Sequence, residues 1–433
     1  MRPCALSAPS RLNAITPRPK EAFIFTGDPE ATGQADLRSS RTPWATPPSL
    51  GIPPVTDDFR CDVLIVGAGV TGALMAERLT RGGLDVVLID RETPGQGSTM
   101  ASTAMLLWEI DRSLVELTQL YGLERAARCY RASLHAVSEL QALVRQHRLP
   151  CRMRAKNSLY LATGDTAKPL HEEFTLRSRI DLPGAFLNHT TLLNTFDIAR
   201  AAAILSPASA DADPVLLTRG LLQISLQRGA RLFKANAIAF DGAGSAVSVG
   251  LDNDHEIEAR HVVLATGYVM PKIVRPTIQK VNSSWAIATV SQPQNLWKDG
   301  ALIWENSEKY HYARTTDDGR IIFGGEDDDK IIEPEARNAA IPEKTRRLTQ
   351  KLAALWPRAV LDVDFQWSGT FDTTRDGLPL IGAVPGVKNV FAAYGYGGNG
   401  ITFSYLAAEL ITAMIGGGTS PLLDDFALDR DIG

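Results

Sequence analysis

The stretch Val63-Leu64-Ile65-Val66-Gly67-Ala68-Gly69-Val70-Thr71-Gly72 decides the fold of this 433-residue chain. Its apolar, β-branched start is typical of a buried parallel strand. The glycine turn leads into a helix that we predict over residues 70–81, and Gly82-Gly83 ends this helix. Residues 85–90 are apolar again and predict a second strand. Strand, turn, helix and strand within about 30 residues predict a βαβ unit.

The turn fits the pattern G-x-G-x-x-G of a dinucleotide site, and Asp90 ends the next strand. Gly67 allows the tight turn, Gly69 lets a pyrophosphate approach the backbone, and Gly72 lets helix and strand pack closely. The helix start offers free N–H groups to phosphate, and Asp90 can accept hydrogen bonds from ribose hydroxyls. A glycine turn without a ligand is the alternative. The predicted cofactor-binding residues here are Gly67, Ala68, Gly69, Val70, Thr71, Gly72, Asp90 and the adjacent Arg91.

Two further segments favour a flavin dinucleotide. Gly97, Ser98 and Thr99 open a loop-to-helix junction, where hydroxyl groups can donate to phosphate or simply cap the helix. Near the C-terminus, residues 394–402 hold four glycines in six positions directly before a helix, which is costly in chain entropy unless a cofactor lies against the backbone. The cofactor-binding residues predicted there are Gly397, Gly398, Asn399, Gly400 and Ile401.

The remaining pattern predicts alternating blocks of helix and strand. We expect helices over residues 111–148, 216–227 and 401–415, buried strands over 262–265 and 390–393, and strands and loops over 151–190. Asp318-Gly319 is a two-residue hairpin turn. Residues 1–57, rich in Pro, Ser, Thr and Gly, predict a loosely ordered arm. The acidic stretch 326–329 predicts a solvated loop and no metal site.

Composition excludes several classes of protein. A net charge of −4 gives no reason to expect nucleic acid as a partner. No apolar run reaches the length of a transmembrane helix. The four cysteines, Cys4, Cys61, Cys129 and Cys151, are scattered without a C-x-x-C pair, so we expect reduced thiols and a cytoplasmic protein.

Together these motifs resemble the D-amino-acid oxidase / glycine oxidase / sarcosine oxidase superfamily of FAD-dependent oxidoreductases, with similarity to gamma-glutamylputrescine oxidase. The resemblance covers about residues 59–420 and adds the motifs Leu264-Ala265-Thr266-Gly267 and Arg375–Gly382. It implies an α/β fold in which a Rossmann-type FAD-binding domain is interleaved with a substrate domain that contains a mixed, largely antiparallel sheet. The implied FAD domain comprises residues 59–113, 205–278 and 372–420, and the substrate domain 114–204 and 279–371.

The resemblance also implies site residues and leaves the electron acceptor open. Ala265, Thr266 and Gly267 join the cofactor-binding set. Residues 91–108 contain no His and residues 369–371 no Cys, so we expect non-covalent FAD. Sarcosine-oxidase-like members carry an oxygen-activating Lys after a Phe-Gly-Gly strand end, where this chain has Asp329. This difference leaves open whether oxygen or another molecule accepts the electrons from the flavin.

Tyr310, Tyr312 and Arg314 alternate, so we predict that they share one face of a strand and form the catalytic site. A guanidinium beside two phenols could hold a substrate carboxylate, although an exposed sheet face with an ordinary Arg is the alternative. His311 points the opposite way and is expected to be structural.

The resulting hypothesis is an enzyme that oxidises the C–N bond of a small amine or amino acid to an imine, by hydride transfer to flavin N5. A flavin-binding electron-transfer or structural subunit of a larger complex is the alternative from another class. An NAD(P)-linked dehydrogenase is a third.

Overall fold

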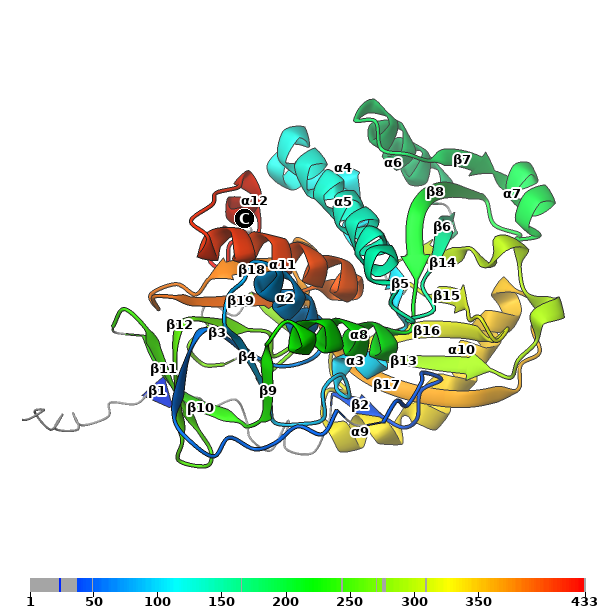
Figure 1. Ribbon diagram of the computed structural model, residues 1–433. Coiled ribbons are helices and arrows are strands. Elements are labelled where there is room, and N and C mark those ends of the chain that lie inside the picture. Colours follow the sequence, from blue (N-terminus) through cyan, green and yellow to red (C-terminus); the bar gives the residue numbers. More distant parts are fainter. Residues whose placement is uncertain are drawn as a thin grey trace, which may run out of the picture.

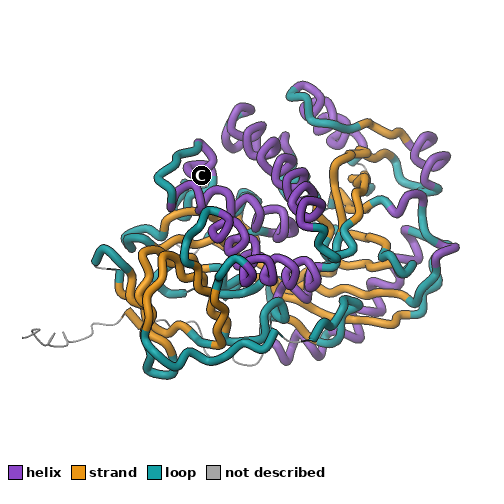
Figure 2. The backbone as a smooth tube through the Cα atoms, viewed as in Figure 1, coloured by secondary structure: helices purple, strands orange, loops and turns teal. Residues whose placement is uncertain are grey.

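The strands of this protein form two sheets that lie next to each other in the computed structural model (Figure 1). The structure describes residues 23–24, 37–48, 50–164, 166–242, 244–269, 271–274, 278–307 and 310–431. Figure 2 shows strands running through the middle of the molecule and helices outside them. Among the described residues, no helix is both long and apolar enough to cross a membrane.

Sheet A has a parallel centre that carries the predicted βαβ unit. In spatial order its strands are β1 (Phe23–Ile24), β10 (Ala237–Asp241), β11 (Val247–Leu251), β12 (Glu256–Leu264), β3 (Phe59–Val66), β4 (Val86–Asp90) and β9 (Arg231–Lys234), with β19 (Val390–Tyr394) beside β12 and β18 (Leu380–Ala383) beside β19. Strand β3 pairs in parallel with both β4 and β12, and α2 (Val70–Arg81) begins and ends where the glycines predict.

Alternate residues of β3 face two different cores, which explains its unbroken apolar run. Val63 and Ile65 pack with residues of the helical layer. Leu64 and Val66 pack on the opposite face with residues of β10 and β11. A parallel strand buried on both faces has no polar side to expose.

Sheet B is mostly antiparallel. In spatial order its strands are β2 (Arg38–Ser39), β17 (Val363–Thr374), β13 (Gln279–Thr289), β16 (Ile321–Asp328), β15 (Tyr312–Thr315), β14 (Leu302–Asn306), β6 (Arg154–Ala162), β8 (Ala202–Asp211) and β5 (Met105–Leu106), with β7 (Ala185–Asn188) on β8. Only β14 and β6 pair in parallel among these strands as described. The Asp318-Gly319 hairpin is confirmed: Thr316 N–H donates to Arg320 O at 3.0 Å, and Gly319 has φ +82°.

The helices pack on the sheets and on one another. Besides α2 they are α3 (Ser98–Ala101), α4 (Leu114–Tyr121), α5 (Leu123–His147), α6 (Ala167–Arg179), α7 (His189–Phe196), α8 (Pro214–Gln227), α9 (Pro334–Ala339), α10 (Ile341–Leu355), α11 (Gly400–Ile415) and α12 (Pro421–Asp425). The predicted helical stretch 111–148 is divided at Gly122, whose φ of +81° interrupts the helix. The prediction of only strands and loops over 151–190 missed α6 and the start of α7.

The interleaving of the two sheets along the chain agrees with the resemblance, with local differences. Strand β5 and residues 205–211 of β8 belong to sheet B, although the resemblance implies that residues 59–113 and 205–278 are part of the FAD domain. Part of the predicted arm, 1–57, lies outside the described residues. Its described part is not loose: β1 pairs with β10, β2 pairs with β17, and Trp44 is buried. Turn-rich composition concealed these contacts because they are made with distant strands.

Candidate functional site

A cavity of about 300 Å³ brings together the glycine turns of sheet A and the tyrosines of sheet B. Most of the predicted cofactor-binding residues line it: Gly67, Gly69, Val70, Thr71, Asp90, Arg91, Gly97, Ser98, Thr99, Ala265, Thr266, Gly267, Gly397, Gly398, Asn399, Gly400 and Ile401. Ala68 and Gly72 do not line the cavity; they support the turn from behind. Its walls also include strands β13 and β17 of sheet B.

In the first turn the backbone of Gly67 lies so close to the end of β12 that only glycine fits. Gly67 has φ +106°, and a Cβ there would collide with Ala265 O at the end of β12. Ala68 N–H donates to Asp90 Oδ2 at 2.7 Å, and Glu92 N–H donates to Asp90 Oδ1 at 2.9 Å. Burial raises the pKa of Asp90, and these two N–H groups counteract the rise. A carboxylate fixed in this way keeps lone pairs that can accept from a ribose.

The loop at Gly97 meets the start of α2. Val70 N–H donates to Thr99 Oγ1 at 3.0 Å, so Thr99 joins the two segments. Ser98 makes no cap bond, and its buried Oγ has no hydrogen-bond partner among the described residues. Helix capping therefore does not account for Ser98, and its hydroxyl is free to bind a group in the cavity.

The C-terminal glycine turn lies close to the first turn. Thr71 Oγ1 and Ser404 Oγ are 2.7 Å apart, so the starts of α2 and α11 are in contact. Asn399 Nδ2 donates to Glu109 O at 2.7 Å, and Gly398 N–H donates to Asp111 Oδ2 at 2.8 Å. Two helix starts thus converge on one cavity, where their N–H groups favour negative charge.

The predicted trio of Tyr310, Tyr312 and Arg314 is divided by the structure. Tyr310 and Tyr312 line the cavity with ring centroids 6.1 Å apart. Burial raises the pKa of both phenols, which therefore stay protonated and can donate hydrogen bonds. His311 faces away, bonded to Glu305 Oε2 at 3.0 Å and stacked on Phe323, as predicted.

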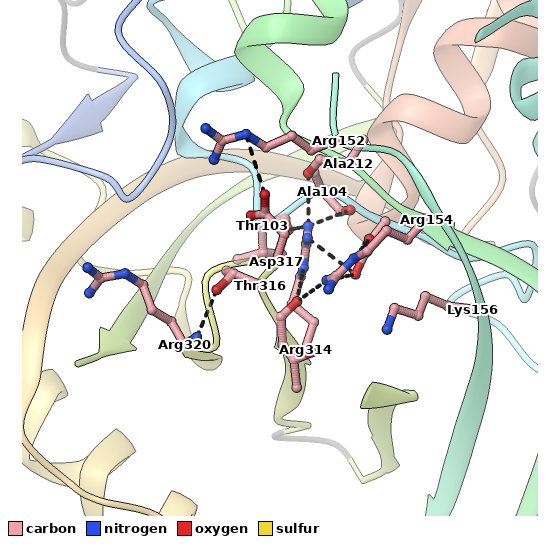
Figure 3. Close-up of polar contacts among 12 residues, drawn as sticks. Thr103, Ala104, Arg152, Arg154, Lys156, Ala212, Arg314, Thr316, Asp317 and Arg320 are labelled. Atoms are coloured by element: carbon pink, nitrogen blue, oxygen red, sulfur yellow. Dashed lines mark hydrogen bonds and ion pairs between the residues drawn. The ribbon is translucent and has the colours of Figure 1, made fainter. Parts of the chain in front are cut away.

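Arg314 does not line the cavity, so its predicted role as a carboxylate anchor is wrong. Its Nη1 donates to the carbonyl oxygens of Thr103, Ala104 and Ala212 at 2.8–3.0 Å (Figure 3). Its Nη2 lies 3.3 Å from Asp211, a carboxylate that it shares with Arg154. The alternation of residues 310, 312 and 314 predicts which face of the strand Arg314 is on. It does not show that backbone carbonyl oxygens accept the hydrogen bonds of its guanidinium.

Glu109 and Asp111 are cavity residues that the sequence reasoning missed. With Leu107 they line the cavity at every second position, while Trp108 and Ile110 are buried in the core. That alternation after β5 is the signal that could have revealed them. Asp111 is enclosed by protein but open to the cavity, and burial raises its pKa to about 6 against the effect of the Gly398 N–H.

The acidic stretch 326–329 is also more ordered than predicted. Glu326 to Asp328 complete β16. Asp327 Oδ1 is shielded from solvent without a hydrogen-bond partner among the described residues, and burial raises the pKa of this carboxyl to about 6. Asp329 lies at the surface and pairs with Lys280.

These residues fit a flavin dinucleotide. Two bare backbone turns face one cavity, and Ser98 Oγ and Trp304 Nε1 are buried in cavity-lining residues without partners among the described residues. Each such orphaned atom costs free energy unless a bound group satisfies it. The described lining contains neither His nor Cys.

Comparisons with known proteins agree with this geometry. A family model described as FAD dependent oxidoreductase (DAO) matches residues 62–414. Gamma-glutamylputrescine oxidoreductase of Escherichia coli is 22% identical over 379 residues, covering 84% of this chain and 85% of that protein. Among solved structures, glycine oxidase from Geobacillus kaustophilus aligns with a TM-score of 0.73 at 21% identity, covering 86% of this chain and 100% of that chain. L-proline dehydrogenase from P. horikoshii aligns with a TM-score of 0.71 at 16% identity, covering 86% and 97%.

Proposed function

Because the chain belongs to the DAO family of FAD-dependent oxidoreductases, we propose that it oxidises the C–N bond of a small amine or amino acid to an imine. The observation that carries this proposal is the shared cavity, in which both glycine turns and the phenols of Tyr310 and Tyr312 face one space. The names of the relatives support the substrate class, since they include oxidoreductases of a putrescine derivative, glycine and proline.

The glycine turn would hold the dinucleotide half of FAD, with Asp90 accepting from the ribose and Ser98 donating to phosphate. Both assignments rest on the fixed Asp90 carboxylate and the unsatisfied Ser98 hydroxyl. We propose that FAD is bound without a covalent link, which the absence of His and Cys from the described lining supports. The free, buried Cys61, Cys129 and Cys151 support a reducing, cytoplasmic setting.

When bound, the flavin supplies N5 as the acceptor of a hydride. The C–H bond of the substrate gives up its electron pair, the nitrogen lone pair forms the C=N bond, and the nitrogen loses a proton. Tyr310 and Tyr312 orient the substrate by donating hydrogen bonds, and their rings exclude water from the reacting carbon. Water then converts the imine to a carbonyl compound and an amine. The electrons pass to oxygen or to another acceptor.

An anaerobic substrate screen tests this proposal. The purified holoprotein is mixed with amino acids, N-methyl amines and diamines, and the absorbance of oxidised flavin is followed. Bleaching by at least one amine, with release of the matching carbonyl product, is expected. Readmission of oxygen or of a dye then identifies the acceptor. A flavin that dithionite reduces but no amine reduces would favour the alternative, an electron-transfer or structural subunit.

A further inference from the structure

The acids of the cavity indicate a substrate class, and this inference rests on the proposed function. We propose that the substrate carries a second, permanently protonated amino group, bound by the carboxylates of Glu109 and Asp111, and no carboxylate beside the reacting carbon.

The charges around the cavity are unequally distributed. Among the described lining residues the only cation is Arg91, next to Asp90 where the dinucleotide half binds. The part near Tyr310 and Tyr312 holds Glu109 and Asp111 and, in the residues described there, no Lys, Arg or His. A substrate carboxylate would meet two like charges, and no described cation faces this part of the cavity to bind it, which disfavours binding.

Glu109 is unsatisfied although it is 2% exposed. Its Oε1 accepts from Ser158 Oγ at 2.5 Å, but its Oε2 has no hydrogen-bond partner among the described residues. Nη1 of Arg177 lies 3.9 Å from Glu109 Oε1, which is too far for a hydrogen bond, whereas Nε of Arg177 donates to Glu173 Oε1 at 2.7 Å. One guanidinium between two carboxylates leaves one negative charge, and a buried charge without a partner is costly.

Asp111 adds a second charge on the same wall. Its Oδ2 accepts a hydrogen bond from the Gly398 N–H at 2.8 Å. Burial raises the pKa of Asp111 to about 6 and that of the nearby Asp327 to about 6. His311 and Lys344 counteract the rise for Asp327, and neither residue lines the cavity.

Aromatic rings complete a site for a cation. Trp304 lines the cavity and stacks on Tyr160 at 3.6 Å, and it pairs in register with Tyr312 across β14 and β15. Ring faces attract ammonium groups, more strongly where water is excluded. The carboxylates and rings together therefore favour an organic cation.

The cation cannot be the reacting nitrogen itself. That nitrogen must be neutral during hydride transfer, because its lone pair then forms the C=N bond. Glu109 then needs a different positive group to offset its burial, and Asp111 adds a second negative charge on the same wall. A diamine supplies one, whereas a simple amine or an α-amino acid does not.

Three compounds of equal chain length test the proposal: 1,4-diaminobutane, n-butylamine and 4-aminobutanoate. Their distal groups are an ammonium, a methyl and a carboxylate. In anaerobic flavin reduction by the holoprotein, we expect 1,4-diaminobutane to have an apparent Kd at least about tenfold below that of n-butylamine, and 4-aminobutanoate to be the poorest. Glycine and proline are included as α-amino acids.

Variants attribute the preference to the two carboxylates. In Glu109→Gln and Asp111→Asn the preference for the diamine, measured as the apparent Kd of n-butylamine divided by that of 1,4-diaminobutane, should fall several-fold. Glu305→Gln is the matched control, because Glu305 is a half-buried carboxylate bonded to His311 and Arg200 outside the cavity. Flavin content reports folding, and either carboxylate variant suffices if the other does not fold.

Each outcome has a distinct meaning. Equal or better reduction by n-butylamine, 4-aminobutanoate, glycine or proline would overturn the diamine proposal but uphold amine oxidation. An unchanged diamine preference in both carboxylate variants would also overturn it. Failure of every amine, with a flavin that dithionite still reduces, would instead contradict the proposed function.

Discussion

At the scale of single residues, Asp372 is a buried carboxyl whose ionisation opposes folding. It lies on β17, fully buried, and Gly395 N–H donates to its Oδ2 at 3.1 Å. Burial raises its pKa from 3.8 to about 7, against the effect of the N–H groups of Gly395 and Tyr396. Between these two values the native protein holds a proton that the unfolded chain has released. Rising pH therefore lowers the free energy of unfolding, by up to about 1.4 kcal/mol per pH unit.

We predict that Asp372→Asn removes this dependence. The amide oxygen keeps the bond from Gly395 but cannot ionise, so the variant should gain stability relative to the parent as pH rises from 4 to 7. Urea unfolding at pH 5 and pH 7 measures the difference between the two proteins. Asp111 and Asp327, whose pKa values are also raised, are present in both proteins, so their contributions to the pH dependence cancel in the difference. A difference that does not change with pH would contradict the prediction.

At the scale of elements, the turn between β3 and α2 depends on the end of β12. Gly67→Ala would place a Cβ against Ala265 O in a backbone conformation that L residues rarely adopt. Since neither backbone segment can move freely, we expect most bound flavin to be lost. Gly83→Ala is the control, because Gly83 has φ +80° but no atom within 4 Å of the added Cβ. It should cost about 1–2 kcal/mol and retain flavin. Equal flavin loss in both variants would refute a local collision.

The elements also show what the sequence can predict. The βαβ unit, the hairpin at Gly319 and the converging glycine turns follow from local patterns, because period and turn chemistry are encoded by neighbouring residues. The surroundings of Arg314 and Trp44 do not follow from local patterns. Arg314 bonds to Ala212, which is 102 positions away along the chain, and Trp44 bonds to Ser102, which is 58 positions away. Glu109 and Asp111 can be predicted only in part. Their alternation is a local pattern, but the cavity that they face is formed by distant segments of the chain.

At the scale of the whole molecule, the cofactor site joins the two sheets. The cavity is lined by Gly67 and Ala265 from sheet A segments and by Trp367 and Tyr312 from sheet B, so one FAD bound in it would contact both halves. A ligand that binds only the native state stabilises it by about 2.7 kcal/mol at a hundredfold excess over Kd. We therefore predict that FAD added to deflavinated protein raises the Tm of a single cooperative transition. Calorimetry with increasing FAD measures this, and Gly67→Ala should abolish the rise. Two transitions, of which FAD shifts only one, would show that the sheets unfold separately and that the cofactor does not couple them.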